Sequence, residues 1–261
     1  VRFVAEDDGR FLESLADEEG LTGSCTVLLK PLYNVQDYAI ATSYSPVDQS
    51  GEYTLDADLF NAKKKGRAFL EVEIWDPQGH QVDKTGKWVF FGKRSEASQQ
   101  ISATLPKVQA WNAEAPRLYT MVIRMYDEYM TLQDIVGTRF GFRTLSTADG
   151  FTLNGRPITF RGITVLTPLA MSTPQEVQAV RARLVQMKQQ NINAVRTLGG
   201  GPAPARFYEL CDELGFYVVC DANLFPQSTM GHVVAADNEY SDLFCDRMRS
   251  MYGEYKNHPS I

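Results

Sequence analysis

The hydrophobic pattern of this chain changes its period once, near Asp149-Gly150. Before that point, short runs of β-branched and aromatic residues alternate with turn signals such as Asp76-Pro77-Gln78-Gly79. After it, short apolar runs alternate with segments of helical period. This order predicts an all-β domain followed by an α/β domain.

The β half contains about seven to eight short strands, a number typical of an immunoglobulin-like β-sandwich. Glu52–Leu59 and Phe69–Ile74 alternate apolar and polar residues, which predicts one buried and one wet face for each strand. The expected strands are Thr26–Lys30, Asp37–Ser45, Glu52–Phe60, Ala68–Trp75, Lys87–Phe91, Ser98–Leu105, Tyr119–Tyr126 and Gln133–Phe142.

The second half begins with a predicted hairpin, Phe151–Phe160, whose tight turn is Asn154-Gly155. Thr173-Pro174, with Glu176 in the first turn, predicts the start of a helix that runs to about Gln190. Strand and helix signals then alternate, which predicts right-handed crossovers and a parallel sheet. These elements are a strand at Asn193–Arg196, a helix at Ala203–Leu214, a strand at Phe216–Cys220 and a helix at about Tyr240–Tyr255.

Composition narrows the class of protein. With 44% hydrophobic and 22% charged residues and a net charge of −6, the chain has the composition of a soluble globular protein. Because its one basic run, Lys63-Lys64-Lys65, fits a solvated loop, nucleic-acid binding is disfavoured. The sequence contains no apolar run of about 18 residues, the length that a membrane-spanning helix needs. The four cysteines show no metal-ligand spacing, so buried free thiols are expected, and the three tryptophans are expected in core or interdomain space.

Six motifs, in order, resemble the glycoside hydrolase family 2 proteins, and the β-galactosidase group in particular. The strongest is Met187–Arg196, which matches the segment that leads into a barrel strand of that family. The others are Asp8–Glu13, Trp111–Tyr119, Asn154–Gly162, Tyr208–Val219 and Lys256–Ile261.

The resemblance implies a remnant of a jelly-roll sugar-binding domain at residues 1–34 and an immunoglobulin-like β-sandwich at residues 35–147. Residues 148–261 would be the first strands and helices of a (β/α)8 TIM barrel. Such enzymes are retaining glycosidases that use two carboxyl groups about 5–5.5 Å apart. In the family both catalytic glutamates follow the Asn-His-Pro-Ser motif, so we expect them beyond Ile261. We therefore expect residues 1–261 to be inactive alone.

Some segments depart from the family pattern. Thr197–Pro202 replaces a polar run that contacts sugar hydroxyls, and Ile163–Pro168 replaces a histidine-rich loop. Phe225 stands where the family has a glutamate that helps to position magnesium, and a phenyl ring gives no oxygen ligand. We therefore expect no metal site and no cofactor.

Four residues are candidates for contacts to substrate or to the catalytic carboxylates. Arg196 ends a predicted barrel strand, and in the resemblance the matching arginine orients the nucleophile, which suits its planar fork. Asp221 and Asn223 end the next strand and would face the same pocket, although strand-end polar residues also cap helices and form turns. Arg161, at the first barrel strand, fits an internal ion pair at least as well as a ligand contact.

Three functions remain open on the sequence alone. The first is part of a β-galactosidase-like glycosidase whose partner is a carbohydrate substrate. The second, favoured by the apolar loop at Gly199–Pro204 and by Phe225, is a non-catalytic carbohydrate-binding or scaffold protein with a degenerate glycosidase fold. The third, an adhesion-type β-sandwich, is disfavoured by the strand-helix repeats. Because an incomplete barrel exposes apolar edges and faces, we also expect self-association.

Overall fold

The structure is a computed structural model that describes residues 29–63, 65–93, 95–148, 150–166, 171–198, 203–222 and 238–261. Residues Pro31–Ile261 form one compact unit. The expected jelly-roll remnant and the strand expected at Thr26–Lys30 lie almost wholly outside the described residues. The domain division at residues 34/35 and 147/148 stays a prediction.

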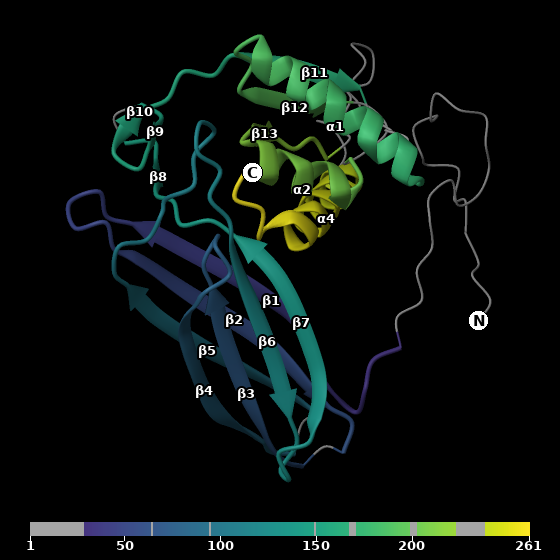
Figure 1. Ribbon diagram of the computed structural model, residues 1–261. Coiled ribbons are helices and arrows are strands. Elements are labelled where there is room, and N and C mark those ends of the chain that lie inside the picture. The colour runs from purple at the N-terminus through teal and green to yellow at the C-terminus, as the bar shows by residue number, and fades with distance from the viewer. Residues whose placement is uncertain are drawn as a thin grey trace. The chain divides into compact units, whose positions relative to one another are not determined.

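Two antiparallel sheets form the β-sandwich (Figure 1). One sheet has the order β1-β2-β5, and the other has the order β4-β3-β6-β7. Alternate residues of both sheets meet in one core; in β2 these are Tyr53, Leu55, Ala57 and Leu59, each at most 1% exposed. The strands are β1 (Tyr33–Tyr44), β2 (Gly51–Asn61), β3 (Gly66–Trp75), β4 (Gln81–Phe91), β5 (Glu96–Leu105), β6 (Tyr119–Tyr126) and β7 (Leu132–Phe140).

A small three-stranded sheet follows the sandwich. It consists of β8 (Leu145–Ser146), β9 (Thr152–Leu153) and β10 (Arg156–Pro157). The predicted Asn154-Gly155 turn is confirmed, since both residues have positive φ, 53° and 75°. Two residues with positive φ give the twist that a two-residue hairpin needs.

Among the described residues, three parallel strands and three helices make up the α/β part. Strands β11 (Gly162–Leu166), β12 (Ala194–Leu198) and β13 (Tyr217–Val219) pair in parallel, and helices α1 (Pro174–Gln189), α2 (Ala205–Leu214) and α4 (Asn238–Tyr255) accompany them. The described fold is therefore a β-sandwich followed by part of a (β/α) barrel, as predicted. No helix among the described residues is long and apolar enough to cross a membrane.

The helix boundaries follow from local chemistry. Thr173 caps α1, and its side chain accepts a hydrogen bond from Glu176 N while the Glu176 side chain accepts from Thr173 N. This reciprocal capping box satisfies two amide groups that the helix itself cannot pair. Helix α2 ends at Gly215, whose φ of 76° lies in the left-handed region that favours glycine.

Candidate functional site

The sheet β11-β12-β13 has one covered and one open face. Val195 and Val218 pack in a core with residues of α1, α2 and α4, among them Leu184, Phe207 and Tyr255. Side chains alternate between the two faces along a strand. Arg196 follows Val195 and Val219 follows Val218, so Arg196 and Val219 lie on the opposite face. That face is exposed: Leu166 is 71% and Val219 61% accessible.

Arg196 and Asp221 meet toward the carboxyl end of this open face. Arg196 Nη2 lies 3.1 Å from Asp221 Oδ2, and the Asp221 amide donates to Thr197 Oγ1 at 3.1 Å. The Arg196 side chain is 53% exposed, whereas that of Asp221 is 12% exposed. In barrels of this type the carboxyl ends of the strands carry the active site. The structure thus brings together two of the four predicted site residues at the end of the sheet where catalysis occurs in such folds.

The other two predicted residues are not part of this pair. Arg161 precedes β11, so it lies at the amino end of the strands, and its Nε donates to Asn191 O at 2.8 Å. It therefore holds the loop before β12 rather than lining the carboxyl end. Asn223 lies outside the described residues.

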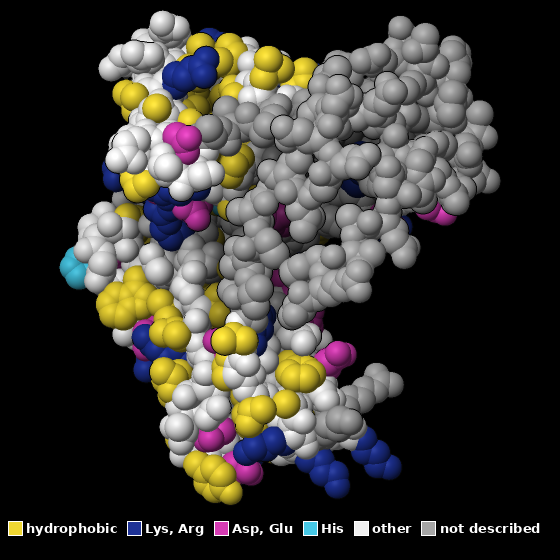
Figure 2. Space-filling model, turned by 90° about the vertical axis from the view of Figure 1, so that its right-hand side faces the viewer, with side chains coloured by type: hydrophobic (Ala, Val, Ile, Leu, Met, Phe, Trp, Pro, Cys, Tyr) yellow, Lys and Arg dark blue, Asp and Glu magenta, His cyan; other side chains and the backbone are white. Residues whose placement is uncertain are grey.

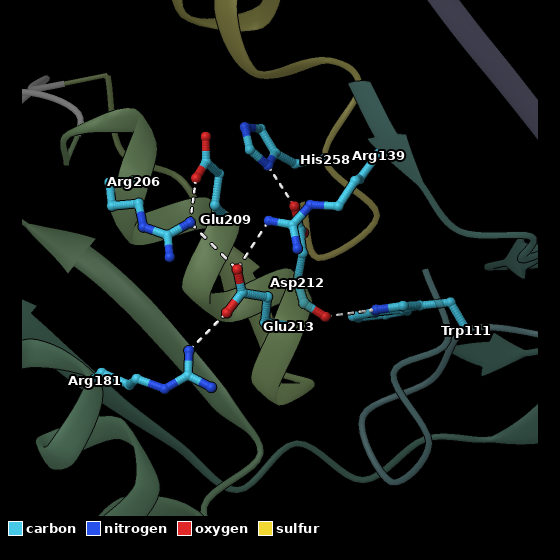
Figure 3. Close-up of polar contacts among 8 residues, drawn as sticks. All are labelled: Trp111, Arg139, Arg181, Arg206, Glu209, Asp212, Glu213 and His258. Atoms are coloured by element: carbon cyan, nitrogen blue, oxygen red, sulfur yellow. Dashed lines mark hydrogen bonds and ion pairs between the residues drawn. The ribbon is translucent and has the colours of Figure 1, made fainter. Parts of the chain in front are cut away.

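A second polar cluster, which the sequence did not reveal, joins α2 to the C-terminal turn and to the sandwich (Figure 3). Asp212 is 4% exposed, and its carboxylate lies 2.6 Å from His258 Nδ1 and accepts from Ser260 N at 3.0 Å. Its carbonyl oxygen accepts from Trp111 Nε1 at 3.0 Å. A buried carboxylate needs such partners, because desolvating an unpaired charge is costly.

The same turn is attached to strand β1. Asn257 Oδ1 accepts from Ile40 N at 2.8 Å and Asn257 Nδ2 donates to Tyr38 O at 3.0 Å, so the side chain pairs with β1 as a neighbouring strand would. Lys256 Nζ forms an ion pair with Asp37. The segment that resembles the approach to a catalytic strand is therefore fixed by both the sandwich and α2.

Glu213 forms a third cluster, in which one carboxylate binds three arginines (Figure 3). Its oxygens lie 2.6 Å from Arg181 Nη1, 2.9 Å from Arg139 Nη2 and 3.2 Å from Arg206 Nη1. Burial opposes ionisation, yet the hydrogen bonds from Arg181 and Arg139 outweigh it and hold the pKa of Glu213 below its ordinary value. The cluster ties β7, α1 and α2 together.

Glu213→Gln should therefore lower the free energy of unfolding by about 1 to 2 kcal/mol at neutral pH, since the half-exposed arginines regain water in part. A lowered pKa stabilises the fold fully above the ordinary value of 4.5, and this contribution is lost as pH falls through the folded value. Urea unfolding at pH 7 and pH 3.5 should show the difference shrinking at the lower pH. A difference that stays constant would contradict the assignment. Glu209→Gln is the matched control, because among the described ion pairs Glu209 contacts only Arg206.

Metal binding finds no support in the geometry. Within the part of the chain that the structure describes, no three His, Cys, Asp or Glu side chains come close enough to hold an ion. The expectation of no metal and no cofactor stays a prediction.

The cysteines and tryptophans fit the sequence expectations in part. Cys211 is buried, and burial raises the pKa of its thiol well above the ordinary value. Cys245 is exposed, in contrast to the expectation of buried thiols, because it lies on a solvated side of α4. Trp111 is fully buried between the sandwich and α2 as expected, but Trp88 is 37% exposed and is not a core residue.

Two family profiles match the chain almost from end to end of its described unit. The profile "Glycosyl hydrolases family 2" matches residues 33–143, and the profile "Glycosyl hydrolases family 2, TIM barrel domain" matches residues 146–261.

Relatives and solved structures agree with these matches. A protein named beta-galactosidase from Pseudoalteromonas haloplanktis is 30% identical over 100% of this chain and 26% of its own length. One of the same name from Lactobacillus delbrueckii subsp. bulgaricus is 31% identical over 93% and 24%. This chain thus spans about a quarter of the length of these relatives.

Two solved structures share the fold. A glycosyl hydrolase family 2 member from Bacteroides cellulosilyticus superposes with a TM-score of 0.73 at 21% identity, over 87% of this chain and 30% of its own. The beta-glucuronidase of Bacteroides uniformis gives 0.70 at 22% identity, over 89% and 28%. At such identities the likeness concerns the fold alone.

Proposed function

Because this chain belongs to glycosyl hydrolase family 2, we propose that it forms part of a longer retaining β-glycosidase that acts on terminal β-galactosides. The relatives that match at about 30% identity carry the name beta-galactosidase, which supports this substrate class. The reaction needs one carboxylic acid to protonate the leaving oxygen and one carboxylate to attack the sugar. We expect both glutamates outside residues 1–261, so these residues alone should be inactive.

The observation that carries the proposal is the Arg196–Asp221 pair on the open face of the sheet. A guanidinium offers five N–H donors in a planar fork, so one carboxylate at 3.1 Å can hold it in place while it pairs with another acceptor. Arg196 would orient the nucleophile in this way, and Asp221 would fix Arg196. Both would be positioning residues rather than proton donors or nucleophiles.

An assay with 4-nitrophenyl β-galactoside tests the proposal. Residues 1–261 should show no turnover, whereas a polypeptide that continues for the full length of the relatives should hydrolyse the substrate with retention of configuration. In the longer polypeptide, Arg196→Ala should lower kcat/KM by about 10²-fold, since misplacing a reacting group by about 1 Å has that effect. Turnover by residues 1–261, or an inactive longer polypeptide that contains both glutamates, would refute the proposal.

A non-catalytic carbohydrate-binding or scaffold protein is the second candidate. Thr197 follows Arg196 in the segment where the family carries sugar-contacting polar residues, yet it is fully buried and its hydroxyl accepts from the Asp221 amide. It therefore supports the chain rather than offering a hydroxyl to substrate. Calorimetric binding of a galactoside by the longer polypeptide, without hydrolysis, would favour this candidate.

We further infer that residues 1–261 self-associate through the open face of β11-β12-β13. Leu166 and Val219 lie on it at 71% and 61% exposure, and apolar side chains on an exposed sheet favour association. Sedimentation at micromolar concentration should show dimers or larger species, and Leu166→Glu with Val219→Lys should shift them toward monomer. A monodisperse monomer of the unaltered chain would contradict the inference.

A further inference from the structure

The outer face of the sheet β4-β3-β6-β7 carries a row of aromatic rings. Across the strands, Trp88 pairs with Phe69, and Phe69 pairs with Tyr126. Phe90 follows on the same side of β4, where the cross-strand partner is Arg67. We call Phe69, Trp88, Phe90 and Tyr126 the aromatic platform. Trp88 is 37% and Phe90 70% exposed, although large aromatic side chains are usually covered.

Three rings of the platform, those of Phe69, Trp88 and Tyr126, pack against neighbouring side chains. The Phe69 centroid lies 5.3 Å from that of Trp88 and 6.5 Å from that of Tyr126. The Arg67 guanidinium lies 4.5 Å from the Trp88 centroid and covers part of the indole. A Cβ on Gly86 would come within 2.4 Å of Phe69 Cζ, so the missing side chain there leaves room for the Phe69 ring against β4. Such restraints reduce the entropy lost when a ligand binds.

The platform is twisted rather than flat. Phe69 is inclined by 58° to Trp88 and by 47° to Tyr126. Binding to a flat crystalline polysaccharide needs coplanar rings. The tilts between these rings instead suit a single flexible polymer chain, whose units can each adopt their own orientation.

Charged side chains border the platform, and they cancel one another. Lys84 Nζ lies 3.1 Å from Glu71 and 3.0 Å from Glu73, while Arg124 Nη1 lies 2.6 Å from Glu73. Tyr126 Oη donates to Glu71 Oε1 at 3.3 Å. These two acids and two bases cancel, and Arg67 over Trp88 leaves the platform and its border with a formal net charge of only +1, which gives little electrostatic selection for a polyanion or a polycation.

We propose that the aromatic platform binds a neutral oligosaccharide chain. Sugars present apolar C–H faces that stack on aromatic rings and hydroxyl groups that can donate to carboxylates and accept from Lys and Arg. The platform and its border supply both, in the combination of apolar surface and a few placed polar groups that is typical of ligand sites. Figure 2 shows hydrophobic, basic and acidic side chains interspersed over the lower part of the molecule, and the platform is defined within the sandwich by its residues. This site is built on the sandwich, so it is independent of the proposed catalytic site at Arg196.

The test is a titration of the protein with β-1,4-linked hexasaccharides of galactose, glucose, xylose and mannose, followed by calorimetry and tryptophan fluorescence. We expect at least one of them to bind with a dissociation constant of about 0.1 mM. Trp88→Ala should weaken that binding about tenfold, because it removes the larger of the two exposed rings of the platform. Phe90→Ala, at a side chain that is 70% exposed, serves as a second variant that disturbs folding little.

Tyr252→Ala is the matched control, because Tyr252 is an aromatic residue of α4 at 69% exposure and lies outside the platform. It should bind as the unaltered protein does. The proposal is overturned if no hexasaccharide binds at millimolar concentration, or if Trp88→Ala and Phe90→Ala both leave binding unchanged. It is equally overturned if sedimentation shows a dimer that Trp88→Ala dissociates, since a second copy would then cover the platform. None of these results depends on hydrolysis, so they stand apart from the test of catalysis.

Discussion

Asp212→Ala should lower the free energy of unfolding by about 2 to 5 kcal/mol, because two hydrogen-bond donors would each lose their acceptor, at about 1 to 3 kcal/mol each. The carboxylate is 4% exposed and is the partner of both His258 Nδ1 and the amide of Ser260, which is itself 2% exposed. Alanine would leave the Ser260 amide buried and the partly buried His258 ring without this acceptor, and the buried amide carries the larger desolvation cost. Urea unfolding at pH 7 measures the loss, and a change below about 1 kcal/mol would contradict the role of Asp212.

Two further variants separate charge from hydrogen bonding. Asp212→Asn keeps an oxygen acceptor for the Ser260 amide and an isosteric side chain toward His258, so it should destabilise the fold less than alanine does. A double-mutant cycle of Asp212→Ala with His258→Ala should give a coupling energy of about 1 to 3 kcal/mol. If the two single changes were additive, the contact at 2.6 Å would carry no energy of its own.

Local signals in the sequence were sufficient for most of the secondary structure. Tyr119–Tyr126 was predicted with its observed limits as β6, and α1 begins after the expected cap at Thr173. The first half of β4 was missed because Gln81–Gly86 carries polar residues and glycine on a solvated face. The residues after Arg161 were compared with a loop of the family, but they form strand β11. This strand pairs with β12, which lies about 30 residues further along the chain, so no local pattern reveals the pairing.

The candidate site shows where sequence reasoning stops. The period of the strands placed Arg196 and Asp221 at one end of the sheet, and the structure joins them. Arg161 was expected at the first barrel strand, but it immediately precedes β11 and so lies at the amino end of the strands. Asp212 and Glu213 were predicted as part of a helix and of the Tyr208–Val219 motif, without a role as centres of polar clusters. Their partners Trp111, Arg139 and His258 lie 46 to 101 residues away, so no local pattern could reveal them.

Gly215→Ala should lower the free energy of unfolding by about 4 kcal/mol, an effect comparable to that of Asp212→Ala, for two separate reasons. The φ of 76° costs an L-residue about 1 kcal/mol. In addition, the new Cβ would lie 2.2 Å from Ala113 O and 2.9 Å from Ala113 C, which are backbone atoms that cannot turn aside. The end of α2 and the loop after Trp111 would have to separate.

That separation would also break the bridge made by Lys188, whose Nζ donates to Ala113 O at 2.8 Å and to Gly215 O at 2.7 Å. Gly79→Ala is the matched control, because Gly79 has a φ of 85° but nothing within 4 Å of its would-be Cβ. It should cost only about 1 kcal/mol. The difference between the two variants in urea unfolding measures the close approach of α2 to the sandwich alone. Equal losses would mean that the backbone conformation, and not this contact, requires glycine at position 215.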